Sequence, residues 1–155
     1  MEWVMLVYRL PREPSSPRIA VWRKLERLGA ARLGDGVVAL PADARTREQF
    51  DWLADEVLAA GGSCSVWLAA PGSAAQEREV ATCMRAARAA EYEAVTAQAD
   101  AVLAAGTEER IRTVRRLRGE WRRITRRDYF PPPERDAARV AIQALAASTG
   151  DREPA

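Results

Sequence analysis

The first 70 residues alternate between short apolar runs and amphipathic segments, which predicts a mixed domain of strands and helices. Residues 3–10, WVMLVYRL, are aromatic and β-branched and end at a proline, as is typical of a buried strand. Apolar residues at helical spacing follow over 16–28, and two short runs around Gly34-Asp35-Gly36 predict a hairpin. A second helix over 46–61 and a strand over 63–69, SCSVWLA, complete the domain.

The predicted order is β-α-β-β-α-β, which is the ferredoxin-like arrangement. Its two crossovers place the helices at 16–29 and 46–61 on one face of a four-stranded antiparallel sheet. Thr46 with Gln49 predicts a capping box at the start of the second helix. Large aromatic residues favour the interior, so Trp22, Trp52 and Trp67 are expected to anchor the core.

From residue 71 onward the pattern is purely helical, with segments at about 73–104, 107–127 and 134–147. The expected fold is therefore α+β: a ferredoxin-like domain over 1–71, followed by an extension of three helices over 72–150 packed on it. Residues 151–155 form a polar tail.

The second of these helices is unusually basic, with nine arginines between residues 110 and 127 and no lysine. At about 100° per residue, its apolar side chains form one arc of the helix. These residues are Ile111, Val114, Leu117, Trp121 and Ile124. The opposite side carries seven arginines as the candidate site for nucleic acid or another anion: Arg112, Arg115, Arg116, Arg122, Arg123, Arg126 and Arg127.

Three interpretations of this basic side remain open. Charge runs are usually solvated surfaces, partly paired with acids elsewhere in the chain. The second interpretation is binding of nucleic-acid phosphate or another polyanion, and the third is attraction to an anionic membrane surface. The whole chain has a formal net charge of only +2, so the positive charge is local.

Other acidic residues offer further candidate sites. Glu91 falls inside the apolar stripe of the long helix, so we expect it to be buried in an ion pair. Its candidate partners are Arg88, three residues earlier, and an arginine of the following helix. Asp35 and Asp43 could in principle hold a divalent metal for phosphoryl chemistry, although turn chemistry accounts for Asp35.

Composition excludes several classes of site. The chain has no histidine, which removes histidine bases, Ser-His or Cys-His pairs and histidine metal ligands. Cys64 and Cys83 stand alone, so neither a disulfide framework nor a four-ligand zinc site is expected. No secretory signal or spanning helix is predicted, and we expect a cytoplasmic protein without cofactor, metal or membrane partner.

The chain resembles the N-terminal domain of ChrB-type chromate-resistance proteins over nearly its whole length. The residues that carry the resemblance are Leu10-Pro11, Arg18, Trp22-Arg23, Leu25, Gly29-Ala30, Asp35-Gly36-Val37, Leu40-Pro41, Gly61-Gly62, Arg85-Ala86-Ala87-Arg88, Glu91-Tyr92 and Arg127-Asp128-Tyr129-Phe130-Pro131. The resemblance implies a cytoplasmic regulatory protein thought to control a chromate-efflux operon. Longer members carry a second, C-terminal domain, and the resemblance supplies no catalytic residues.

Together these patterns predict a non-enzymatic regulator of chromate resistance that binds DNA through its arginine-rich helix. One alternative is a protein-interaction or oxyanion-sensing module, in which clustered arginines bind chromate or sulfate. The other is a metal-dependent phosphodiesterase of ferredoxin-like fold. A homodimer is compatible with each of them.

Overall fold

The computed structural model describes residues 1–150, which form a mixed α+β structure with one four-stranded antiparallel sheet and five helices. The α+β class expected from the sequence is thus confirmed. The chain divides into two compact units, Met1–Ala81 and a second that begins at Thr82.

The first unit contains the sheet and two helices. Its elements are β1 (Trp3–Arg9), α1 (Ser16–Leu28), β2 (Ala31–Gly34), β3 (Val37–Pro41), α2 (Ala44–Ala59) and β4 (Ser63–Ala69). The strand order across the sheet is β2-β3-β1-β4. Every neighbouring pair is antiparallel, and Val4 in the middle of the sheet lies opposite both Leu40 and Leu68.

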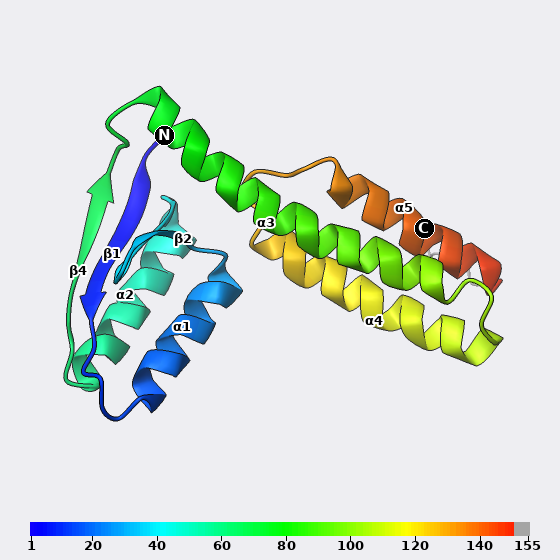
Figure 1. The fold of residues 1–155 in the computed structure, drawn as a ribbon, viewed down its shortest axis with the longest axis horizontal. Helices are drawn as coiled ribbons and strands as arrows, with labels where there is room; N and C mark the ends of the chain where they lie inside the picture. Colours follow the sequence, from blue (N-terminus) through cyan, green and yellow to red (C-terminus); the bar gives the residue numbers. More distant parts are fainter. Residues whose placement is uncertain (151–155) are drawn as a thin grey trace. The chain divides into compact units, whose positions relative to one another are not determined.

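The core of the first unit lies between the sheet and its helices, which Figure 1 shows on the same side of the strands. Successive side chains of β1 and of β3 point to opposite faces of the sheet, so every second side chain points toward the helices. The buried residues that form this core are Val4, Leu6, Val38 and Leu40 from the strands, with Val21, Leu25, Phe50, Leu53 and Val57 from the helices.

The three tryptophans assigned to the core lie at the surface instead, so that prediction was wrong. Trp22, Trp52 and Trp67 are 46%, 55% and 56% exposed. On each helix the tryptophan directly adjoins a buried residue, Val21 or Leu53, and is therefore turned about 100° away from it. Trp67 alternates with its neighbours on β4 and pairs with Met5, on the face of the sheet opposite Val4 and Leu6.

The start of α2 also differs from the predicted capping box. The helix is capped by Asp43, whose Oδ1 accepts a hydrogen bond from Thr46 N at 2.7 Å. Thr46 Oγ1 in turn accepts from Asp43 N at 2.9 Å, so the box lies three residues earlier than expected. Within residues 1–150, no group of three histidine, cysteine or acidic side chains is placed to hold a metal ion.

A substitution at Gly36 tests the geometry of the β2–β3 hairpin directly. Its φ is 69°, and a methyl group there would collide with the backbone carbonyl oxygen of Tyr8. We expect Gly36→Ala to lower the free energy of unfolding by about 2 kcal/mol or more, from left-handed strain and the collision together. Gly34→Ala is the matched control, because nothing lies within 4 Å of a methyl group at that position. Equal urea midpoints for the two variants would contradict this hairpin geometry.

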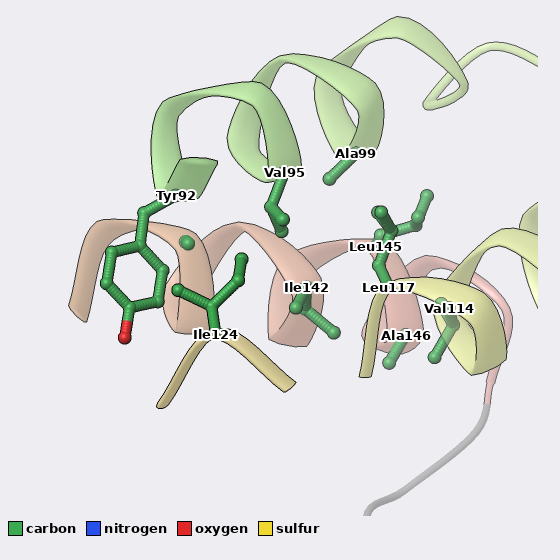
Figure 2. Close-up of a cluster of buried hydrophobic side chains, with 10 residues drawn as sticks. Tyr92, Val95, Ala99, Val114, Leu117, Ile124, Ile142, Leu145 and Ala146 are labelled. Carbon is green, nitrogen blue, oxygen red and sulfur yellow. The ribbon is translucent and has the colours of Figure 1, made fainter. Parts of the chain in front are cut away.

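The second unit is built from three helices around a buried apolar core. α3 (Ala74–Ala101) begins in the first unit and continues into the second, followed by α4 (Thr107–Arg126) and α5 (Glu134–Ser148). Figure 2 shows their side chains pointing toward one another. The core consists of Tyr92, Val95 and Ala99 from α3, Val114, Leu117 and Ile124 from α4, and Ala138, Ile142, Leu145 and Ala146 from α5.

Candidate nucleic-acid interface

The sequence of α4 favours a stable helix, and one side of the helix is buried. Glu108 and Glu109 lie in its first turn and Arg123 and Arg126 in its last, which matches the helix dipole at both ends. Its buried residues are Thr113, Val114, Leu117 and Ile124. Because this stripe is fixed in the three-helix core, the opposite side of α4 has a defined orientation.

The predicted apolar arc of α4 is confirmed at its centre and wrong at one end. Val114, Leu117 and Ile124 are at most 3% exposed, whereas Ile111 is 40% exposed. Ile111 lies about 120° around the helix from Leu117, at the flank of the buried stripe rather than within it. Trp121 is half-buried, and its indole Nε1 donates to the carbonyl oxygen of Arg135 at 3.1 Å.

Six of the seven predicted arginines are exposed on the side of α4 away from this core. We call this set the arginine face: Arg112, Arg115, Arg116, Arg122, Arg123 and Arg126. The structure therefore brings these six side chains onto one surface, as the helical periodicity predicted.

Intramolecular pairing compensates only part of the charge on this face. Arg123 Nη2 lies 2.7 Å from Glu120 Oε2, and Arg116 Nη1 donates to the neutral Gln98 Oε1 at 2.7 Å. Arg126 also has a partner within the chain. By contrast, the side chains of Arg112, Arg115 and Arg122 make no hydrogen bond or ion pair with any part of residues 1–150.

Arg127, the seventh predicted arginine, does not belong to the open surface. Its side chain is only 16% exposed, and its Nη2 lies 2.6 Å from Glu91 Oε1. At about 100° per residue, Arg127 falls at the border between the exposed side and the buried stripe, where it faces α3. Its assignment as an anion-binding residue is therefore corrected to an internal ion pair.

The carboxylate of Glu91 forms ion pairs with two arginines, one on the same helix, α3, and one at the end of α4. Arg88 Nε lies 2.8 Å from Glu91 Oε2, and Arg127 occupies the other carboxylate oxygen. The Glu91 side chain is 32% exposed, so it is less buried than its place in the stripe suggested. Arg88 is 13% exposed, and both guanidinium groups therefore depend on this carboxylate for compensation.

Tyr92, which was not predicted to be part of the apolar stripe of α3, is fully buried next to Glu91 in the chain. Its hydroxyl donates to Asp128 Oδ2 at 2.9 Å. Burial, followed by the hydrogen bond to Asp128 and the charge of that carboxylate, raises the pKa of Tyr92 above its ordinary value of 10.0.

This raised pKa gives a pH-dependent prediction. Above pH 10 the unfolded chain loses the Tyr92 proton while the folded chain retains it, so folding stability falls as pH rises. The loss should reach about 1.4 kcal/mol per pH unit for this one group, and it is absent below the unfolded pKa. We expect the stability of the Tyr92→Phe variant, measured by its urea midpoint, to fall less than that of the wild type between about pH 9 and about pH 11. The same pH dependence in both proteins would contradict it.

A shallow hollow lies along one edge of the arginine face. It has a volume of about 200 Å³ and is lined by Arg115, Arg118 and Arg122 together with Ile111 and Val114. Arg118 is half-buried and has a partner within the chain, so it helps to form the hollow without being part of the open face. The guanidinium groups of Arg115 and Arg122 have no partner within residues 1–150, and two such groups at one small depression are suited to a phosphate group.

The dimensions of the arginine face suit a linear polyanion. From Arg112 to Arg126 the helix rises by about 21 Å, at 1.5 Å per residue. Measured along the duplex axis, this length spans about six phosphates of one DNA strand. Charge-assisted hydrogen bonds from arginine to phosphate are among the strongest available to a protein surface.

Fold and surface together define a class: an α+β unit followed by a three-helix unit whose second helix exposes a basic face. The family model described as "Protein ChrB, N-terminal" matches residues 18–152, and the chain belongs to this family. The chain is also similar to Protein ChrB of Cupriavidus metallidurans, with 29% identity over 145 residues. The match covers 91% of this chain and 44% of that protein, so the chain spans less than half of its relative. No solved structure matches the chain.

Among the described helices, none has both the length and the apolar character needed to cross a membrane.

Proposed function

We propose that this chain is a non-enzymatic regulatory protein of chromate resistance, and that it binds duplex DNA through the arginine face of α4. The observation that carries the proposal is the row of Arg112, Arg115 and Arg122, which lie exposed on one side of a packed helix and have no partner within residues 1–150. Membership in the ChrB family supplies the chromate-resistance context. The βαββαβ order of the first unit supports the proposal that this unit is a ferredoxin-like domain.

The mechanism we propose is mainly electrostatic. Arginines that neutralise phosphates release condensed counterions from DNA, which supplies most of the affinity that does not depend on base sequence. A helix of ordinary diameter fits the major groove, where arginine can also donate to the two acceptors of guanine. Contacts to phosphates would then position α4, and the side chains deepest in the groove would contribute sequence preference.

Binding to a labelled random-sequence duplex, followed by fluorescence anisotropy, tests this function. At about 0.1 M salt, non-specific binding through such a surface should give a Kd of roughly 1 to 100 μM. A duplex that stays unbound even at about 0.02 M salt would remove the DNA-binding proposal, because screening is weakest there.

A further inference from the structure

A second concentration of arginines lies in the first unit, far from α4 in the sequence. A cavity of about 890 Å³ opens where the end of β1, the following loop, the start of α1 and the β2–β3 hairpin meet. We call this cavity the arginine pocket, after the four arginines that line it: Arg9, Arg12, Arg18 and Arg32.

Within residues 1–150, most of the positive charge of the arginine pocket is left uncompensated. Asp35 is the one acidic residue in its lining, so four guanidinium groups and one carboxylate leave three positive charges. Within residues 1–150, none of these five side chains makes a hydrogen bond or an ion pair. The four arginines come from four different segments, so helical periodicity does not account for their convergence on one cavity.

The start of α1 adds to this positive potential. Its N-cap, Ser15, lines the pocket but makes no side-chain capping bond, and the first turn contains no acidic residue. Amide groups at a helix start carry partial positive charge and favour a nearby anion. Their charge reinforces that of Arg18 in the same turn.

The lining of the arginine pocket also contains aromatic and apolar residues. Tyr8, Ile19 and Trp22 line it, and Ile19 and Trp22 are each 46% exposed. Tryptophan side chains usually bury a large apolar area, and Trp22 does not do so fully. An exposed tryptophan beside arginines is suited to stacking on a flat aromatic ring. The pocket therefore combines phosphate-binding groups with a stacking surface.

We propose that the arginine pocket binds a nucleoside phosphate. The arginines would hold the phosphate groups, Trp22 would stack on the base, and Asp35 would accept a hydrogen bond from a sugar hydroxyl. The volume supports this class, because small-molecule sites occupy about 300–1,000 Å³, whereas a single tetrahedral oxyanion would leave most of the cavity empty. Binding here involves no residue of α4, so it stands independently of DNA binding.

Isothermal titration calorimetry of the whole chain with adenosine and guanosine 5′-diphosphate tests the proposal, alongside inorganic phosphate, chromate and adenosine. At least one diphosphate should bind at least about tenfold more tightly than phosphate, chromate or adenosine, because only it engages both parts of the pocket. Arg18→Gln and Arg32→Gln should each weaken this binding by roughly ten- to hundredfold. Trp22→Leu should weaken it about tenfold while leaving the affinity for inorganic phosphate unchanged.

Two matched variants serve as controls. Arg27→Gln removes an exposed arginine of α1 outside the pocket, and Trp52→Leu removes a tryptophan of α2 that is also about half exposed. Both should bind the diphosphate as the wild type does. The proposal is overturned if neither diphosphate binds, if chromate or phosphate binds as tightly, or if the pocket variants retain full affinity. Loss of DNA binding in an α4 variant that still binds the diphosphate would concern the arginine face alone.

Discussion

Replacing Arg112, Arg115 and Arg122 together by glutamine is expected to weaken binding to duplex DNA about a hundredfold at 0.15 M salt. Each phosphate neutralised contributes about 0.9 to the slope of log K against log salt. Three lost contacts therefore remove about 2.7 units of slope, which corresponds to roughly two orders of magnitude at this salt concentration. Folding should be nearly unaffected, because these side chains are exposed and make no partner contacts within residues 1–150.

The matched control removes the same amount of charge from elsewhere. Arg23, Arg27 and Arg47 are exposed on α1 and α2, and none lines the arginine pocket. Glutamine at all three positions should leave most of the DNA affinity in place when anisotropy is measured under identical conditions. If the two triple variants lose affinity equally, net charge rather than the arginine face governs binding.

Glu91→Ala is expected to lower the free energy of unfolding of the second unit by about 3 kcal/mol. The substitution leaves the guanidinium groups of Arg88 and Arg127 mostly buried and without their carboxylate. Removing one partner of a buried pair costs about 3–5 kcal/mol, and the 32% exposure of Glu91 places the effect at the lower end. Hydrogen exchange of the α4 amides reports this unit specifically.

Glu93→Ala provides the comparison for this substitution. Glu93 is an exposed glutamate of α3 and makes no ion pair within the described residues, so its loss should change stability by no more than about 0.5 kcal/mol. Equal protection of the α4 amides in the two variants would show that the arginine–glutamate cluster does not stabilise the three-helix core.

The element boundaries were predictable because local signals mark them strongly. Pro11 ends the first strand, Gly29 ends α1 in a left-handed conformation, and Gly36 permits the hairpin. Periodicity also placed Val114, Leu117 and Ile124 in a core and six arginines on the opposite side. These features depend on neighbours within one helix or one turn, which a sequence displays directly.

The errors arose where a position is decided by contacts between segments. Trp22 and Trp52 adjoin buried residues in sequence, and hydrophobic character alone does not show which side of the stripe faces the sheet. Arg127 directly follows the exposed arginines of α4 in sequence, but its side chain forms an ion pair with Glu91 of α3 and is mostly buried. The arginine pocket gathers side chains from four segments between residues 9 and 32, and no spacing rule reveals that convergence.

The salt dependence of duplex binding is the sharpest test of whether the arginine face binds DNA phosphates. Wild-type protein and the Arg112→Gln, Arg115→Gln, Arg122→Gln variant are titrated with one random duplex over about 0.05–0.3 M salt. We expect a wild-type log–log slope at least as steep as about −2.7, and a variant slope shallower by about 2.7. A wild-type slope near zero, or identical slopes for the two proteins, would contradict it.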